Sequence, residues 1–368
     1  MFVKGHFFEV ENFKLYRPGG FHPVHLGDTF HNDRYTVVHK LGYGSYSTVW
    51  LVKDSVTNRF AALKIIVSES TNIASEMAVF RHLQQSSNLD IDNGDKDYVV
   101  HLLDEFEHHG PNGMHQCIVT EALGPSVYLD DAELMDHFAA GFIPTNISKR
   151  IVAQVSRGIR YLHKHRVVHG DLYPHNILLY TDSLSSRSSQ EDIEGFLGKP
   201  QKMTFQTCDT ATNPSDSLDP HAPQYLVRKP DSMSLRHHCF SNRTSLHVKI
   251  SDFGEAFIWS PEDPEIHDSH CARVFAAPEL LFENSASFAS DIWALGVIVY
   301  HFLCGGSIFP FQHNLVFDMI RKLGPIPSRW YEEWDDRSLL DPPGSEAWKE
   351  VLRAAQFHSP SYSQVTHE

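Results

Sequence analysis

The stretch His169-Gly-Asp-Leu-Tyr-Pro-His-Asn176 decides the fold when it is taken together with Asp252-Phe-Gly254 further along the chain. The first stretch places an acid, Asp171, and an amide, Asn176, in a tight turn, and an apolar run that predicts a strand follows it. Another strand-like run leads directly into Asp252. Carboxylate and amide oxygens are ligands that Mg²⁺ accepts. The two stretches therefore predict a magnesium site at the ends of two strands that are able to pair.

A glycine-rich hairpin lies near the start of the chain. From Tyr35 to Val67, β-branched and aromatic residues alternate around glycines, which predicts three successive antiparallel strands. Between the first two strands stands Leu41-Gly-Tyr-Gly-Ser-Tyr-Ser-Thr-Val49, where Gly42 and Gly44 allow backbone N–H groups to approach a phosphate closely. Glycine-containing turns are common, so this hairpin alone is weak evidence for phosphate binding.

Lys64 lies in the apolar third strand, where an ammonium group is costly unless it is paired. A helical periodicity begins at Asn72 and places Glu76 on the same face as apolar residues. We therefore predict an ion pair between Lys64 and Glu76. The alternative is a surface lysine on an edge strand.

Composition limits the class of protein. The 368 residues are 41% apolar and carry a formal net charge of −15, which repels nucleic acid and anionic membranes and favours basic partners, although the charge also serves solubility. Five widely spaced cysteines without a C-x-x-C pair fit a reducing compartment. The longest apolar run, Ile292 to Cys304, is shorter than the roughly 20 residues of a membrane span and predicts a buried helix.

The periodicity changes along the chain from strand-like to helical, which predicts an α+β fold with two parts. A β-rich part with one helix ends near Ala122, and the rest is mainly helical. A segment rich in Ser, Asp, Pro and Thr interrupts the helical part and predicts an inserted loop. The expected divisions are an N-terminal extension at 1–34, a small lobe at 35–122, a large lobe at 123–180 and 246–368, and the insert at 181–245.

Ala277-Pro-Glu279 and Asp291-Ile-Trp-Ala-Leu-Gly296 follow the earlier motifs in order. With them the chain resembles the eukaryotic protein kinases from about residue 35 to 335. The chain resembles the SR-protein kinases, especially their fungal relatives, at Tyr16-Arg-Pro-Gly-Gly-Phe-His-Pro-Val-His-Leu-Gly-Asp28. A second stretch is similar to the wider group that contains these kinases, Leu323-Gly-Pro-Ile-Pro-Ser-Arg-Trp330. The resemblance implies a bilobal kinase fold.

The resemblance also implies an ATP-dependent protein serine/threonine kinase with ATP and Mg²⁺ as cofactors. Asp171 would act as the base toward the substrate hydroxyl, Asn176 and Asp252 would bind magnesium, and Lys64, held by Glu76, would lie near the α- and β-phosphates. Nucleotide-binding positions carried over from the family are Leu41, Gly42, Gly44, Val49, Ala62, Lys64, Glu121, Leu123 and Leu178.

Protein substrates follow from the same resemblance, and Arg/Ser-rich proteins suit an acidic chain. We expect no direct nucleic acid binding and no membrane association. The expected location is the cytoplasm, the nucleus or both, and no dense run of Lys and Arg predicts a nuclear signal.

Three positions depart from the pattern of active kinases. Tyr173 stands where a lysine is usual, Ala272 where a threonine contacts that lysine, and Ala276 where related kinases carry arginine. These departures leave open a pseudokinase that binds ATP or a partner as a scaffold with little or no catalysis. A small-molecule phosphotransferase is a further alternative, because such loops often read H-G-D, but the Asp291-Ile-Trp motif argues against it.

Overall fold

The computed structural model describes residues 10–70, 73–87, 94–130, 133–134, 138, 142–185, 189–204, 219–230, 233–241, 246–261, 271–310 and 315–333. The chain divides into two compact units. The first comprises Met1–His169 and Pro174–Ser260, and the second comprises Gly170–Tyr173 and Pro261–Glu368. This division does not coincide with the predicted lobe boundaries, which stay predictions. We describe each unit by itself.

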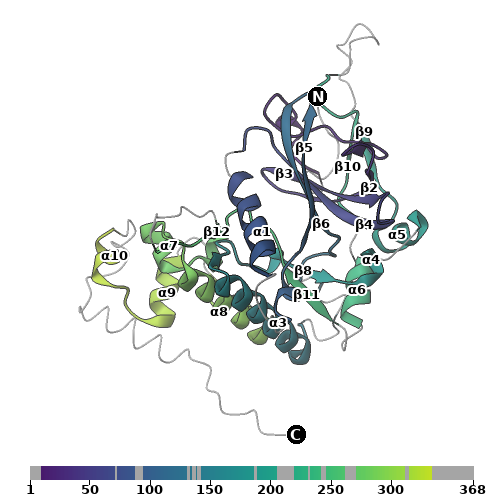
Figure 1. Cartoon of the computed structure of the whole chain (residues 1–368). Helices are drawn as coiled ribbons and strands as arrows, with labels where there is room; N and C mark the ends of the chain where they lie inside the picture. Colours follow the sequence, from purple (N-terminus) through teal and green to yellow (C-terminus); the bar gives the residue numbers. More distant parts are fainter. Residues whose placement is uncertain are drawn as a thin grey trace, which may run out of the picture. The chain divides into compact units, whose positions relative to one another are not determined.

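A six-stranded antiparallel sheet forms the β-rich part of the first unit (Figure 1). Its strand order is β1-β2-β3-β4-β6-β5. The three strands predicted between Tyr35 and Val67 are confirmed as β2, β3 and β4. The bounds are β1 (Thr29–Phe30), β2 (Tyr35–Tyr43), β3 (Ser47–Asp54), β4 (Arg59–Ile66), β5 (Leu102–Gly110) and β6 (Gly113–Glu121).

The alternation of side chains along β4 separates the two faces of the sheet. Ala61, Leu63 and Ile65 belong to a buried cluster with Trp50 and other residues of β2, β3 and β6. The residues between them point to the opposite face, since successive side chains of a strand alternate. One face of the sheet is therefore core, and the other is available to line a cavity.

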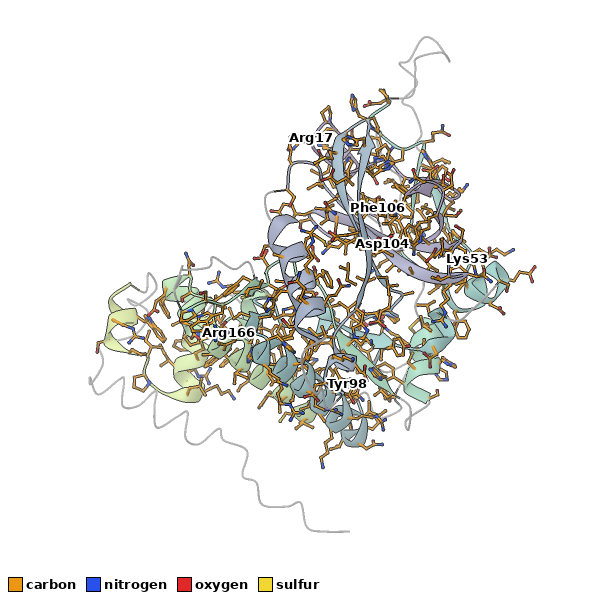
Figure 2. All side chains as sticks on the ribbon, viewed as in Figure 1. Arg17, Lys53, Tyr98, Asp104, Phe106 and Arg166 are labelled. Carbon is orange, nitrogen blue, oxygen red and sulfur yellow. The ribbon has the colours of Figure 1, made fainter. Side chains whose placement is uncertain are left out.

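The two edges of the sheet approach each other near the start of β2. Asp104 of β5 accepts hydrogen bonds from the Tyr35 hydroxyl (2.8 Å) and from Nη1 of Arg34 (3.0 Å). The Phe106 ring stacks on His31, with ring centroids 4.5 Å apart. Figure 2 labels Asp104 and Phe106 on this strand. These contacts curl the sheet around its buried cluster.

Helices and short strands outside the six-stranded sheet complete the first unit. The strands that flank the insert pair as expected: β8 and β11 are antiparallel, with Ile177 opposite Ile250. The remaining elements are η1 (Phe13–Leu15), α1 (Ile73–Ser87), η2 (Lys96–Tyr98), α3 (Thr145–Lys164), β7 (Val167–Val168), η3 (Pro174–Asn176), β8 (Ile177–Tyr180), β11 (His247–Ile250) and β12 (Phe257–Ile258).

The insert contains regular structure in its described residues, where the sequence predicted a loop. β9 and β10 form an antiparallel pair. Val227 of β10 is buried in the core of the six-stranded sheet, and Leu226 packs with Phe21 of the N-terminal extension. The elements are short and take their apolar contacts from other parts of the chain, so they leave no periodicity of their own. They are α4 (Asp182–Ser185), α5 (Gln190–Leu197), β9 (Lys202–Thr204), β10 (Tyr225–Val227) and α6 (Met233–Ser241).

The second unit is helical in its described residues. The predicted helix is found as α8, which begins with a capping box between Ser287 and Ser290, but it is only partly buried, since Ile292 and Leu303 are exposed. Its Val297 packs with Met319 of α9 in a buried cluster. The elements are η4 (Arg273–Phe275), α7 (Pro278–Glu283), α8 (Phe288–Cys304), α9 (Leu315–Leu323) and α10 (Ser328–Glu333). Across the described part of the chain, every helix is too short or too polar to cross a membrane.

Candidate active site

A cavity of about 890 Å³ opens in the first unit on the face of the sheet opposite its core. Twelve of the thirteen predicted site residues line it, from the glycine-rich hairpin, β4, α1, β6, η3, β8 and the segment after β11. The remaining predicted residue, Asp171, belongs to the second unit. The lining residues that the sequence predicted are Leu41, Gly42, Gly44, Val49, Ala62, Lys64, Glu76, Glu121, Leu123, Asn176, Leu178 and Asp252.

Lys64 is the centre of an ion-pair network at one end of the cavity. Its Nζ lies 2.8 Å from Oε1 and 3.0 Å from Oε2 of Glu76, and 2.8 Å from Oδ1 of Asp252. Burial disfavours the charged form of Lys64, but the charges of Asp252 and Glu76 outweigh burial, so the net effect raises its pKa. Lys64 therefore holds a full positive charge between two carboxylates.

The two carboxylates differ in their surroundings. Glu76 is nearly enclosed, with 6% of its side chain exposed, and burial raises its pKa although the Lys64 charge opposes that shift. The side chain of Asp252 is 52% exposed, and the Lys64 charge lowers its pKa. Asp252 is thus an ionised carboxylate that is still accessible from the cavity.

Asp252 has a φ of 63°, in the left-handed region that non-glycine residues rarely adopt. The next residue fixes this turn: Phe253 is fully buried and packs edge-on against Phe80 of α1, with ring centroids 5.0 Å apart. His169 packs against the same ring, and its Nε2 lies 3.1 Å from the Ser251 carbonyl oxygen. A strained residue held by such packing is typical of functional sites.

The glycine-rich hairpin leaves open space where the sequence predicted a phosphate site. A Cβ atom at Gly42 would meet nothing within 4 Å, and one at Gly44 would meet only Ser47 Oγ, at 3.9 Å. The Gly44 N–H donates to the Ser47 carbonyl oxygen at 2.8 Å, which closes the turn. Neither glycine has a positive φ, so backbone conformation does not require glycine here. Glycine instead keeps the space beside the backbone empty.

The other end of the lining combines apolar side chains with one free stretch of backbone. Leu41, Val49, Ala62 and Leu178 supply apolar surface. The Glu121 carboxylate is engaged by Lys249 Nζ at 2.7 Å. Within the described residues, no group hydrogen-bonds to the backbone of Leu123. An apolar slot with unused backbone groups at its edge suits a planar heterocycle such as adenine.

Asp171 is held within the second unit. Its Oδ1 accepts a hydrogen bond from the Ala272 N–H at 3.0 Å. The preceding Gly170 has a φ of 77° and donates its N–H to Oδ1 of the buried Asp291 at 3.0 Å. Asp291 begins the motif Asp291-Ile-Trp-Ala-Leu-Gly296, so that motif anchors the loop that carries Asp171. The Tyr173 ring lies 6.1 Å from the ring of Phe275 in η4.

Sequence reasoning missed the wall that the insert contributes to the cavity. It missed His39, Glu133 and His175 as well. No periodicity or motif marks the insert positions, because they reach the cavity only through the packing of the insert against other parts of the chain. The insert residues in the lining are Leu197, Gly198, Lys199, Gln201, Arg228, Lys229, Pro230, Leu235 and Arg236.

The chain matches the protein kinase domain family over residues 35–185 and 239–367. It therefore belongs to the protein kinase family, and the predicted bilobal α+β kinase fold is confirmed. Enzymes of this family generally use ATP and Mg²⁺.

Curated relatives narrow the position within the family. The chain is 38% identical to protein kinase dsk1 of Schizosaccharomyces pombe, over 81% of this chain and 66% of that protein. It is 31% identical to serine/threonine-protein kinase SRPK of Physarum polycephalum, over 87% of this chain and 73% of that protein. Identity to human SRSF protein kinase 3 is 39%, over 46% of this chain and 30% of that protein. The predicted resemblance to SR-protein kinases is confirmed, and the chain spans less than two thirds of the fission yeast and human relatives.

Proposed function

We propose that this chain is a serine/threonine protein kinase that transfers the γ-phosphate of ATP to protein hydroxyls. The observation that carries the proposal is the position of Lys64, paired with both Glu76 and Asp252 at one end of a cavity with an apolar slot at the other. Phosphoryl transfer depends on positioned charges of this kind. The names of the relatives support the same activity.

The cavity suits ATP and Mg²⁺ by its chemistry. When bound, ATP supplies the phosphoryl group, and Mg²⁺ neutralises the negative charge that develops on that group during transfer. Asp252 and Asn176 would hold the metal ion, and Lys64 the phosphates. The described residues contain no group of three or more His, Cys, Asp or Glu side chains placed to hold a metal. Mg²⁺ at Asn176 and Asp252 would take its other ligands from phosphate oxygens and water, as it commonly does.

Asp171 is the proposed base. The Ala272 N–H fixes one of its oxygens, which orients the carboxylate. Tyr173 lies at the position of the usual lysine, and the loss of one positioned charge donor slows such chemistry by roughly 100- to 1000-fold. The chain is then a slow kinase. A catalytically inactive scaffold, the alternative that the sequence left open, gains no support from relatives that are all named as kinases.

The substrates proposed for this enzyme are proteins, with Arg/Ser-rich sequences as the first class to test. The relationship to proteins named as SRSF and SRPK kinases and the net charge of −15 both support this choice. The same relationship supports a place in the cytoplasm, the nucleus or both.

The test is transfer of labelled phosphate from ATP to an Arg/Ser-rich protein by the wild-type chain and by Asp171→Asn. We expect incorporation by the wild type and a loss of at least about 100-fold in the variant, because the base is removed while its shape is kept. Asp97→Asn, an exposed carboxylate outside the cavity, is the matched control and should retain full activity. Equal incorporation by wild type and Asp171→Asn would contradict the proposal.

A further inference from the structure

A buried ion pair lies behind the edge of the apolar slot, at the end of β6. Nζ of Lys249 lies 2.7 Å from Oε1 of Glu121, and the two side chains are 5% and 14% exposed. Glu121 is among the described residues that line the cavity, and Lys249 is not. Any effect of Lys249 on a bound nucleotide therefore acts through Glu121.

The same Glu121 oxygen also contacts His101, the residue before β5. It accepts a hydrogen bond from the His101 N–H at 3.0 Å, and Nδ1 of the His101 ring lies 3.7 Å away. Burial and then the charge of Lys249 lower the pKa of His101, although the charge of Glu121 opposes this shift. Lys249 is therefore the cation that compensates the Glu121 carboxylate near neutral pH.

Lys249 belongs to the pair of strands that supplies Leu178 to the slot. In the antiparallel pairing of β8 and β11, Lys249 lies directly opposite Leu178, which lines the cavity. The Lys249 ammonium also lies 4.9 Å from the centroid of the Tyr180 ring, at the end of β8. Lys249 thus joins Glu121 at the edge of the slot to the strands that carry its apolar surface.

Different kinds of contact hold the two ends of the edge of the slot. At one end, the Gly124 N–H donates to the Leu179 carbonyl oxygen of β8 at 2.8 Å. At the other end, the Glu121 N–H donates to the His101 carbonyl oxygen at 3.3 Å, which keeps it within the six-stranded sheet. The backbone therefore ties Gly124 to β8, while a side chain ties Glu121 to β11.

The backbone carbonyl oxygen of Glu121 is the acceptor whose position matters for a purine in the slot. It accepts a hydrogen bond from the Thr120 hydroxyl at 3.3 Å, and a carbonyl oxygen has a second lone pair for another donor. The 6-amino group of adenine is such a donor. A bond of this kind needs a distance of about 2.7–3.2 Å between its heavy atoms, so a small displacement of Glu121 removes it.

We propose that Lys249 is a positioning residue for nucleotide selection. Through the Glu121 carboxylate, it holds the Glu121 carbonyl oxygen where that oxygen accepts the 6-amino group of adenine. This inference rests on the proposed binding of ATP and deepens it, because it assigns the preference for adenine to a residue outside the cavity. The alternative is an ion pair that stabilises the fold and has no part in nucleotide selection.

The experiment compares ATP with purine riboside triphosphate, a nucleotide that lacks the 6-amino group. Isothermal titration calorimetry on the full chain, with Mg²⁺ present, gives both dissociation constants and does not depend on catalysis. We expect the wild type to bind ATP about tenfold more tightly, since one hydrogen bond contributes about that factor. Lys249→Met should weaken ATP binding about tenfold and leave binding of the other nucleotide unchanged, so that the preference disappears.

Three further variants separate a positioning role from a structural one. Lys249→Arg keeps the charge and should keep most of the preference. Glu121→Gln keeps an acceptor for the His101 N–H but weakens the tie to Lys249, so its preference should be intermediate. Lys40→Met is the matched control, since Lys40 is a buried lysine that pairs with Glu11 outside the cavity. It should melt at a lower temperature and keep the wild-type preference.

The outcomes distinguish this inference from the proposed function. A folded wild type that does not bind ATP contradicts both. A wild type that binds the two nucleotides equally would overturn the inference and leave the proposed function standing. A Lys249→Met protein that melts at a lower temperature and keeps the preference would also overturn the inference, because the pair then serves the fold alone. If Lys249→Met does not fold, Glu121→Gln decides, and a full wild-type preference in that variant overturns the inference.

Discussion

The six-stranded sheet holds two lysines that are each paired with a buried glutamate. Lys64 of β4 pairs with Glu76 in the cavity, and Lys40 of β2 pairs with Glu11 of the N-terminal extension. The Lys40 side chain is 0% exposed and that of Lys64 is 20% exposed. Both pairs join the sheet to a segment outside it, so their chemistry can be compared directly.

The two pairs differ in what else surrounds the ammonium. Lys40 faces the rings of Tyr43 and Trp50, and burial lowers its pKa although Glu11 opposes the shift. Lys64 experiences the same effect of burial, but the second carboxylate, Asp252, reverses it and the pKa rises. A buried pair with an additional, accessible carboxylate is suited to bind a ligand, while a sealed pair contributes only to the fold.

Lys64→Met tests the cavity side of this comparison and has the largest expected effect. Removing the cation takes away a positioned charge, so we expect phosphate transfer to fall by about 100- to 1000-fold. The increase in melting temperature caused by Mg-ATP should disappear as well. Lys149→Met, an exposed lysine outside the cavity, should change neither measurement. If Mg-ATP still stabilises Lys64→Met, Lys64 has no part in nucleotide binding.

Lys40→Met tests the buried Lys40–Glu11 pair. It leaves Glu11 buried without its cation, and such a change costs about 3–5 kcal/mol of the free energy of unfolding, which urea titration measures. The Mg-ATP-dependent rise in melting temperature should persist, since the cavity is untouched. The double variant Lys40→Met/Glu11→Gln should recover part of the loss because no charge remains buried. A Lys40→Met protein as stable as Lys14→Met would show that the sealed pair contributes nothing.

The comparison also explains what the sequence predicted and what it missed. Lys64 was predictable because strand alternation around it is regular and its unpaired burial would be costly. Lys40 was not, because β2 has irregular register on both sides of it, between Val37 and His39 and again between Lys40 and Gly42. These irregularities bury both His39 and Lys40 and break the alternation that sequence reasoning uses. Glu11, the partner of Lys40, lies in the N-terminal extension, which has no periodicity from which its position could be predicted.

The insert was harder to predict for a related reason. Its Ser- and Asp-rich composition indicates a loop, and its short elements bury residues such as Val227 in the core of a distant sheet. The insert residues that line the cavity carry no motif, and only the fold brings them there. Sequence motifs therefore predicted the residues expected to bind ATP and Mg²⁺. The insert residues of the cavity are placed by tertiary contacts, which leave no local pattern in the sequence.

A cluster of three histidines lies where the N-terminal extension packs on the sheet. The His22 ring packs against His108 of β5 and His115 of β6, with ring centroids 4.5 and 5.1 Å away. Burial, followed by the charges of His108, His115 and His25, lowers the His22 pKa to about 3. Burial also lowers the pKa of His108 and of His115. The extension therefore packs on the sheet through imidazoles whose burial disfavours protonation, in contrast to the Lys40–Glu11 salt bridge.

Acidification tests this last contrast and has the smallest expected effect. Above about pH 7.5, His22 is neutral in the folded and unfolded chain and contributes no pH dependence. Below that pH the unfolded chain binds a proton that the folded chain refuses, so the free energy of unfolding falls by up to about 1.4 kcal/mol per pH unit for this one histidine. In His22→Gln, urea titrations between about pH 7.5 and 5.5 should show a shallower slope. His109→Gln, an exposed neighbour on β5, should keep the wild-type slope, and equal slopes in wild type and His22→Gln would mean that His22 is protonated in the folded state.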